Sequence, residues 1–411
     1  MIELERYGKI RENIYKYIIC ILLIYFLLAS YYMNIAVIFG SRSTEHDVSI
    51  ISGLTVVKEL HKLSEHTVEI IYISKEGTWE IGGNLNNIEY FRKNEAKGKE
   101  IQLLFTKDKK FTVKEKGLFG KTHIFDLVMP ITHGMNGEDG TLQGLLEMTG
   151  VPYTGSKVLG SALGMDKIAM KDILSSHKLP QVKYVSFYRN DWQLQPDDVS
   201  QHILQSLQFP IFIKPANLGS SIGITRATDK ESLEQAIEVA CYYDSRVICE
   251  EGVEDLQEIN CAVRGNSTEQ KASLLEEPVT FQDFLTFEEK YINSGGTMQG
   301  IKSKVKIPAQ LPNEKMTEEI QEAAKQVFKV LNCSGIARID FLVDKQKKCF
   351  YVNEINTIPG SLQNHLWKES GISFSQLLED FIENALDSQR EKEKNSFAFQ
   401  SNILQKGEMK K

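Results

Sequence analysis

The chain has 411 residues, of which 42% are apolar and 25% are charged, and its formal net charge is −7. This length predicts two or three domains, and the composition is typical of a soluble globular protein with a substantial core. The negative charge argues against nucleic acid as a partner, because binding a phosphate backbone requires a basic face.

Residues 1–32 differ in composition from the rest of the chain. An uncharged apolar run, YIICILLIYFLLASYY at residues 17–32, follows Arg6, Lys9, Arg11 and Lys16. It resembles a signal anchor or signal-peptide core, but it is shorter than the roughly 20 residues that span a bilayer comfortably. No linker separates it from the next apolar segment, so we expect an upstream extension and a functional chain that starts at Met33. Membrane anchoring by residues 17–32 is the alternative.

From Met33 onward, strand-like and helix-like segments alternate, which predicts an α/β protein. We expect a first domain over residues 33–155, with strands at 34–39, 68–74 and 123–134 and hairpins and loops over 75–120. Helices are expected at 48–63 and 142–150, the second ending at Gly150 because glycine commonly closes a helix.

Two further domains and a tail are expected beyond Gly155. A central domain over 156–249 begins with one helix at 160–179, followed by strands at 182–187, 210–215 and 222–227 and a helix near 199–207. A C-terminal domain over 250–387 contains the strand 258–265, the helix 317–332, a hairpin over 335–356 and a helix at 374–386. Residues 388–411 are polar and predict a frayed tail.

The six cysteines form no C-x-x-C pair; they are Cys20, Cys241, Cys249, Cys261, Cys333 and Cys349. This spacing argues against a zinc site or a disulfide framework. It favours reduced, buried thiols in a cytoplasmic protein.

The hairpin RIDFLVDKQKKCFYVNEINTIPG, residues 338–360, places polar groups in two otherwise apolar strands. Arg338 and Asp340 share one face of the first strand, and Glu354 and Asn356 share one face of the second. With the turn near 344–348, pairing sets Arg338 opposite or close to Glu354. Two carboxylates and an amide oxygen predict a Mg²⁺ or Mn²⁺ site. A buried ion-pair network is the alternative.

A second pattern, FIKPANLGSSIGIT, places Lys214 at a strand end before a small flexible loop. Backbone N–H groups near Ser220 and Ser221, together with the ammonium, are suited to cradle phosphate. A helix does not follow, so this is not the loop of P-loop enzymes. A glycine-serine hairpin turn is the alternative.

Two polar loops follow strands of the first domain. GSRSTEHDVSIISG lacks G-x-G-x-x-G, which disfavours a dinucleotide site. It places Glu45 in the first turn of a helix, where it would either favour the helix dipole or hold a cation. In THGMNGEDGTLQG, His133 would orient neighbours, titrate near neutrality or serve only the turn.

Seven motifs occur in an order that resembles the D-alanine–D-alanine ligase family of ATP-grasp enzymes. They are STEHDVS, HGMNGEDGTLQG, PYTGSKVLGSALGMDK, KPANLGSSIGI, EKY, GIARIDF and NEINTIPG, and the likeness runs from Met33 to about residue 386. The resemblance implies a three-domain ligase that holds ATP between its central and C-terminal domains. It also implies a reaction in which ATP activates D-alanine as an acylphosphate for attack by a second amine, in peptidoglycan synthesis.

The resemblance also implies a role for each matching residue. Glu45 would hold the ammonium of the first D-alanine, in a hydrogen-bonded triad with Ser220 and Tyr291. The nucleotide would be bound by Lys167, Lys214, Ser221, Glu250 and Glu258. Two Mg²⁺ or Mn²⁺ ions would be held by Asp340, Glu354 and Asn356.

The remaining implied roles concern the second half-reaction. Arg338 and the N–H of Gly360 would stabilise the tetrahedral oxyanion. His133 and Lys290 would shape the substrate site, and a homodimer is expected of the family.

One position departs from the family pattern. Where the family has a serine that binds the second carboxylate, this chain has His365, with Ser361 and Asn364 as neighbouring substitutes. The sequence therefore allows D-alanine, D-serine or D-lactate as the second substrate, although the EKY motif favours an amino acid over a hydroxy acid. A nucleotide-binding homologue without ligase activity is a further alternative.

Overall fold

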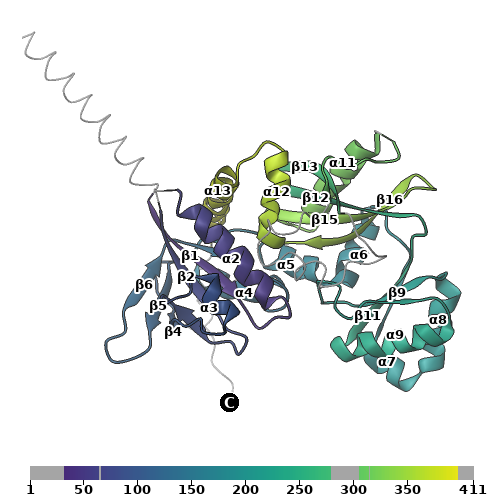
Figure 1. Cartoon of the computed structure of the whole chain (residues 1–411), viewed down its shortest axis with the longest axis horizontal. Helices are drawn as coiled ribbons and strands as arrows, with labels where there is room; N and C mark the ends of the chain where they lie inside the picture. Colours follow the sequence, from purple (N-terminus) through teal and green to yellow (C-terminus); the bar gives the residue numbers. More distant parts are fainter. Residues whose placement is uncertain (1–31, 64–65, 279–304, 314, 397–411) are drawn as a thin grey trace, which may run out of the picture.

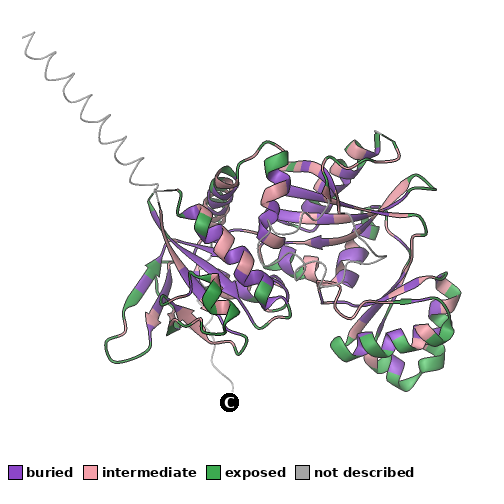
Figure 2. Ribbon diagram, viewed as in Figure 1, coloured by how far each residue is buried: buried purple, intermediate pink, exposed green. Residues whose placement is uncertain are grey.

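The structure is a computed structural model that describes residues 32–63, 66–278, 305–313 and 315–396. Its strands form three sheets that follow one another along the chain, and helices pack on each of them (Figure 1). The buried residues concentrate on the strands and on the inner sides of the helices (Figure 2). This arrangement confirms the predicted α/β class.

The first sheet contains seven strands in the order β6-β5-β4-β3-β2-β1-β7. The strands are β1 (Met33–Gly40), β2 (His66–Ile73), β3 (Trp79–Ile81), β4 (Lys99–Leu104), β5 (Phe111–Glu115), β6 (Thr122–Phe125) and β7 (Leu127–Pro130), with helices α2 (His46–Leu60), α3 (Ile88–Arg92) and α4 (Thr141–Thr149). β1 runs parallel to both β2 and β7. Val37 and Phe39 of β1 pack with α2 on one face, whereas Ala36 and Ile38 pack with α4 on the other.

The segment 123–134, expected to contain a single strand, instead contributes to β6 and β7. These strands lie at opposite edges of the sheet, where β6 pairs with β5 and β7 pairs with β1. Asp126 separates them: its N–H donates to the carbonyl of Asn34, and its Oδ2 accepts from the N–H of Asn34, both at 2.8 Å. Apolar residues continue on both sides of this aspartate, so the apolar pattern alone did not locate the break.

The second sheet has four antiparallel strands in the order β10-β9-β11-β8. Its elements are α5 (Val158–Met165), α6 (Lys167–Ser176), β8 (Tyr184–Tyr188), α7 (Arg189–Leu194), α8 (Pro196–Ser206), β9 (Ile211–Pro215), β10 (Thr225–Ala227), α9 (Lys230–Tyr243) and β11 (Arg246–Glu251). β9 and β11 carry the apolar core between this sheet and α8 and α9, including Ile213 and Val247. They also carry the charged residues Lys214 and Glu250, both of which are buried.

The single helix expected at 160–179 is wrong, because the chain forms α5 and α6 with a break at Asp166. The Oδ1 of Asp166 accepts hydrogen bonds from the N–H groups of Ile168 at 3.0 Å and Ala169 at 2.9 Å. Aspartate is a favoured N-cap because it satisfies these otherwise unpaired donors. Its Oδ2 is ion-paired with Arg246 of the second sheet.

The third sheet has five antiparallel strands in the order β14-β13-β12-β15-β16. Its elements are β12 (Leu256–Gly265), β13 (Gln270–Pro278), β14 (Val305–Lys306), α11 (Lys315–Val330), β15 (Gly335–Asp344) and β16 (Cys349–Asn356). Ala337, Ile339 and Phe341 of β15 face a core formed with α11 and α6. Arg338 and Asp340 lie on the other face, so the polar residues of the hairpin are not core positions.

The end of the described chain returns to the first sheet. Beyond β16 lie the short turn η1 (Gly360–Gln363), α12 (Asn364–Glu369) and α13 (Phe374–Glu393). Leu377 and Phe381 of α13 belong to the same apolar cluster as Val37 and Phe39 of β1. The first and last parts of the described chain therefore share one core.

The expected tail over 388–411 is wrong in its first six residues, which continue α13 to Glu393. Two of these residues form ion pairs: Lys392 with Glu147 of α4, and Glu393 with Lys109 at 2.9 Å.

Of the described cysteines, Cys241, Cys249, Cys261 and Cys333 are buried free thiols and Cys349 is a partly exposed one, in agreement with the prediction of reduced thiols.

The described residues contain no helix with both the length and the apolarity that crossing a bilayer requires. Residues 17–31 lie outside the described residues.

The packing of α13 yields a stability prediction. We expect Phe381→Ala to lower the free energy of unfolding by about 3 kcal/mol, because Phe381 is only 3% exposed within the shared core and its removal leaves a cavity. Glu383→Ala, on the exposed side of the same helix, should change it by less than about 0.5 kcal/mol. Urea unfolding followed by tryptophan fluorescence measures both. Equal effects of the two variants would contradict a core role for α13.

Candidate active site

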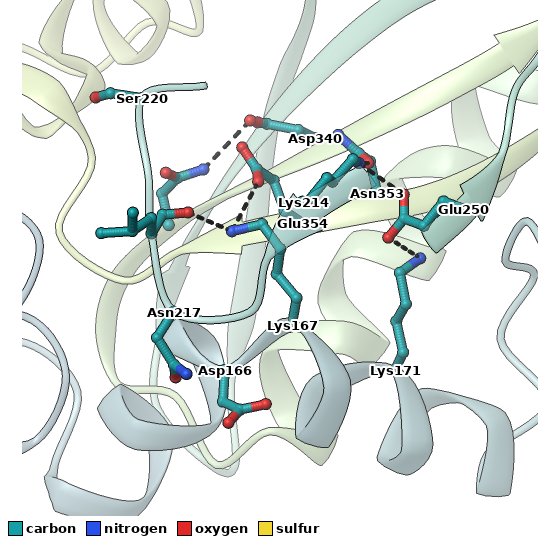
Figure 3. A network of polar contacts seen from close by, with 12 residues as sticks. Asp166, Lys167, Lys171, Lys214, Asn217, Ser220, Glu250, Asp340, Asn353 and Glu354 are labelled. Carbon is teal, nitrogen blue, oxygen red and sulfur yellow. Dashed lines mark hydrogen bonds and ion pairs between the residues drawn. The ribbon is translucent and has the colours of Figure 1, made fainter. Parts of the chain in front are cut away.

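Segments that accompany all three sheets meet at one small pocket. Its lining includes Glu138 from the loop before α4, Lys167 at the start of α6, Gly219 from the loop after β9, and Glu354 of β16. Figure 3 shows how the charged side chains around this pocket point toward one another from the second and third sheets. These segments carry most of the motifs singled out in the sequence.

The third sheet presents two polar rows to this pocket. Asp340 pairs with Glu354, and Arg338 pairs with Asn356. Arg338 is therefore close to Glu354, as predicted, but not directly opposite it. The register shifts just beyond Asp340, where Asn353 forms a bulge on β16. Directly paired residues lie on the same face of an antiparallel sheet, so all four polar groups face the same side.

The row that contains Asp340 extends across two further strands. Asn260 of β12 pairs with Asp340 on one side and with Glu276 of β13 on the other. The Nδ2 of Asn260 donates to the Oε1 of Glu276 at 3.1 Å. Glu258 lies two residues before Asn260 and therefore faces the same side. A continuous polar strip thus runs from β16 to β13.

Arg338 and Asp340 form a two-pronged ion pair. The Nε of Arg338 lies 2.6 Å from Oδ1 of Asp340, and its Nη2 lies 2.7 Å from Oδ2. The Nδ2 of Asn356 donates to the same Oδ2 at 3.2 Å. This geometry fixes the orientation of the carboxylate, as bidentate guanidinium contacts do.

The same residues fit a divalent cation that is shared with a phosphorylated substrate. No group of three or more His, Cys, Asp or Glu side chains within the described residues is arranged to hold a metal ion by itself. Asp340, Glu354 and Asn356 instead supply two carboxylates and an amide oxygen. Mg²⁺ typically binds through one or two carboxylates and completes its coordination with phosphates and water.

Two buried lysines approach the pocket from the second sheet and its leading helix (Figure 3). Lys167 Nζ donates to the carbonyl of Leu218 at 2.6 Å and lies 3.7 Å from Oε2 of Glu354. Lys214 Nζ lies 2.6 Å from Oε2 of Glu250 and 3.3 Å from Oδ1 of Asn353. Both ammonium groups therefore contact the third sheet, next to the predicted metal ligands.

The loop between β9 and β10 lies next to the lysines and is fixed by hydrogen bonds at Asn217. Asn217 contributes its N–H and its side-chain Nδ2 to Oδ2 of Asp244, at 2.8 and 3.0 Å. Ser220 and Ser221 adopt positive φ angles of 53° and 59°, which side-chain-bearing residues rarely adopt. Successive residues in this conformation turn the backbone sharply, as a phosphate-binding loop requires.

Glu45 and Ser220 come together as the family resemblance implied, since Ser220 Oγ donates to Oε1 of Glu45. Glu45 is the N-cap residue before α2 and not part of its first turn, which corrects the expected position. A Cβ added at Gly219 would lie 2.7 Å from Oε2 of Glu45, so glycine is required for this close approach. Tyr291, the third member of the implied triad, and Lys290 lie outside the described residues.

A buried carboxylate beside Glu45 was not singled out in the sequence. Glu138 accepts hydrogen bonds from the N–H groups of Gly134 at 2.9 Å and Ile358 at 3.3 Å. Burial, together with the negative charge of Glu45, raises the pKa of Glu138 to about 8. Burial and the neighbouring carboxylate therefore both favour the protonated form of Glu138.

His133 is hydrogen-bonded to α2, which in turn is hydrogen-bonded to the turn η1. Its Nε2 lies 2.9 Å from Ser52 Oγ, which accepts the N–H of Ser361 at 3.0 Å. Burial and the positive charge of Arg338 outweigh the backbone hydrogen bond at Ile358 and lower the pKa of His133 to about 4. The expectation that it titrates near neutrality is therefore wrong, whereas its orienting role fits these contacts.

Gly360 opens a turn in which Ser361, Leu362 and Gln363 have φ angles of 44°, 54° and 50°. Three consecutive residues in the left-handed region are costly and occur mainly at functional sites. After the turn, His365 extends from α12 to Glu276, and its Nε2 is hydrogen-bonded to Oε2 of that residue. His365 is therefore placed at the β13 end of the polar strip, away from Glu354.

Three site residues escaped the sequence analysis: Glu138, Lys171 and Glu276. Glu138 lies within the HGMNGEDGTLQG motif, so its place in that motif could have marked it as a candidate site residue. Lys171 lies one helical turn after Lys167 on the same side of α6, a spacing that also predicts a shared neighbourhood. Glu276 gave no signal, since only the fold brings it to His365.

Solved structures with the same architecture define the class of protein. The D-alanine-D-alanine ligase from Coxiella burnetii is 30% identical, covers 89% of this chain and 97% of its own, and superimposes with a TM-score of 0.73. VanG D-Ala:D-Ser ligase from Enterococcus faecalis is 32% identical, covers 86% of this chain and 99% of its own, and has a TM-score of 0.70. The fold is that of the ATP-grasp ligases, as predicted.

Sequence comparison then identifies the family. Models described as D-ala D-ala ligase N-terminus and D-ala D-ala ligase C-terminus match residues 34–156 and 173–383. The D-alanine--D-alanine ligase of Natranaerobius thermophilus is 40% identical over 374 residues, which are 89% of this chain and 98% of that protein. The enzyme of the same name from Caldicellulosiruptor bescii is 38% identical over 367 residues, covering 88% and 97%. The chain belongs to the D-alanine–D-alanine ligase family.

The raised pKa of Glu138 predicts a pH-dependent stability. The folded protein holds a proton up to about pH 8 that the unfolded chain loses near its ordinary pKa of 4.5, so stability falls as pH rises between these values. From about pH 6 to pH 9 the loss should be about 3 kcal/mol.

Glu138→Gln mimics the protonated form and should remove most of this loss. Unfolding in urea across the pH range measures it, and Glu231→Gln, an exposed carboxylate on α9, is the matched control. The same pH slope in wild type and Glu138→Gln would show that Glu138 is not the proton holder.

Proposed function

We propose that this protein joins two D-alanines to D-alanyl-D-alanine with ATP, for peptidoglycan synthesis. The observation that carries the proposal is the meeting of Lys167 and Lys214 with the strip that bears Arg338, Asp340 and Glu354. Cationic side chains facing an oxygen-rich metal site form the arrangement that phosphoryl transfer requires. The curated relatives named for this activity support the assignment. An ATP-using enzyme with free thiols also fits the cytoplasm.

ATP would lie between the second and third sheets. Lys167 and Lys214 would contact its phosphates, with the loop that carries Ser221 closing over them. Glu250 and Glu258 would bind the adenine and ribose. Two Mg²⁺ or Mn²⁺ ions, held by Asp340, Glu354 and Asn356, would neutralise the charge that develops on the transferring phosphoryl group.

The first D-alanine would bind beside the first sheet with its ammonium at Glu45. A carboxylate oxygen of this D-alanine attacks the γ-phosphorus, the bond to the β-phosphate oxygen breaks, and ADP leaves. The resulting acylphosphate presents a carbonyl to the amine of the second D-alanine, which attacks as it loses a proton. Arg338 and the N–H of Gly360 would stabilise the tetrahedral oxyanion, and inorganic phosphate then leaves.

The second amino acid would bind at the β13 end of the polar strip. His365 is 40% exposed there, and its imidazole, held by Glu276, is placed to contact a carboxylate. Of the neighbouring substitutes, Ser361 is buried at 1% exposure, and Asn364 Nδ2 already donates to the carbonyl of Ser361 at 3.0 Å. We therefore favour His365 as the acceptor contact. D-serine is a second candidate acceptor, because VanG D-Ala:D-Ser ligase is among the similar structures.

The function is tested by phosphate release from ATP with D-alanine, alone and with a panel of acceptors. Wild-type protein should release phosphate only with Mg²⁺ or Mn²⁺ and should form the dipeptide with D-alanine. Asp340→Asn should lower the rate by at least about 100-fold, because the variant loses a carboxylate at the site of phosphoryl charge. Circular dichroism checks that it remains folded. Normal turnover in Asp340→Asn would contradict the metal assignment.

The acceptor contact predicts a difference between the two substrate sites. His365→Ala should raise the half-saturating concentration of the second D-alanine about tenfold, because a charged hydrogen bond is lost, and should leave the first site unchanged. His202→Ala, an exposed histidine on α8, is the matched control. An unaltered half-saturating concentration of the second D-alanine in His365→Ala would make His365 a bystander.

A further inference from the structure

Lys171 is a fully buried charge that the proposed mechanism does not use. It lies on α6, and its side chain has no exposed surface. Among the described residues, the carboxylate within ion-pair distance of its Nζ is that of Glu250, whose Oε1 lies 3.2 Å away. The other oxygen of Glu250 binds Lys214 at 2.6 Å. Two ammonium groups therefore share one carboxylate (Figure 3).

The three charges do not balance within the protein. The Glu250 side chain is 3% exposed and that of Lys214 is 9% exposed, so with both lysines protonated the group carries a surplus positive charge almost out of contact with water. Burial would raise the pKa of Glu250, but the charges of Lys171 and Lys214 outweigh it and hold the pKa low. A single lysine would already neutralise the carboxylate. The second lysine therefore needs a reason beyond folding, since burying an extra charge costs free energy.

The position of Lys214 supplies that reason. Its Nζ also reaches Asn353 of β16, beside Glu354, and so lies at the boundary with the third sheet. A phosphate bound at this boundary draws the ammonium away from Glu250. If Lys214 were the only partner, its movement would leave a buried carboxylate uncompensated, which is strongly unfavourable.

We propose that Lys171 is a positioning residue that keeps Glu250 compensated while Lys214 turns to a nucleotide phosphate. Glu250 thus exchanges a shared pair of lysines for Lys171 alone, and Lys214 is released at low cost. Lys171 touches neither substrate nor reacting atoms and acts only through Glu250 and Lys214. The inference rests on the proposed nucleotide site and adds a residue to it.

The test is a double-mutant cycle between Lys171 and Glu250 with ATP and ADP as probes. Lys171→Met keeps the length of the side chain and removes its charge. It should raise the half-saturating concentration of ATP and the dissociation constant of ADP about tenfold, with D-alanine saturation unchanged. Lys230→Met, an exposed lysine on α9, should change neither nucleotide constant.

The second arm removes the charge that needs compensation. In a Glu250→Gln background, adding Lys171→Met should change ADP affinity less than twofold, because no carboxylate is left uncompensated. ADP binding is measured by calorimetry and folding by thermal unfolding. If Lys171→Met does not fold but the double variant does, Lys171→Gln replaces Lys171→Met in the cycle. Its ADP affinity is then measured alone and in the Glu250→Gln background.

The outcomes separate the inference from the function on which it rests. Equal tenfold losses of ADP affinity from Lys171→Met in both backgrounds would overturn the inference, as would a lowered melting temperature with unchanged ATP saturation. Failure of every Lys171 substitution to fold, with or without Glu250→Gln, would also overturn it and assign Lys171 to the core. Wild-type protein that binds no ADP would instead overturn the proposed nucleotide site.

Discussion

Strand alternation in the third sheet is the constraint on which the rest of the site depends. Each strand must place apolar residues against α11 and α6, so the intervening residues are committed to the opposite face. Ile339 and Phe341 secure the core, and Asp340 between them is thereby held toward the second sheet. A slip of one residue would exchange the two sets and bury the charged residues in the core. Packing of the core thus fixes the direction of the chemistry.

Charge compensation is the second theme of this molecule. Asp340 is held by Arg338, Glu354 by Lys167, and Glu250 by two lysines. Each of these three acidic groups therefore has a basic neighbour within the protein, and binding of a phosphorylated ligand as proposed would be an exchange of partners. Exchange costs less than creation of new ion pairs, because the desolvation of the charges has already occurred on folding.

The sequence predicted the local features well and the distant ones unevenly. The hairpin with its turn at 344–348 and the helix that closes at Gly150 were predicted from the residues themselves. The meeting of Glu45 with Ser220 was predicted only through the family resemblance. The breaks at Asp126 and Asp166 were not, because hydrogen bonds made by an aspartate ended elements that apolar periodicity continued. The pairing of Glu276 with His365 also escaped, since it depends on how α12 settles against β13.

The shared core of β1 and α13 has a consequence for biosynthesis. A ribosome releases β1 and α2 long before α13, which lies near the end of the described chain. During translation the face of the first sheet that carries Val37 and Phe39 remains without one of its covering helices. The first sheet is therefore synthesised early, but its core is completed only when α13 has been synthesised. Until then its apolar face is shielded only if a chaperone binds it.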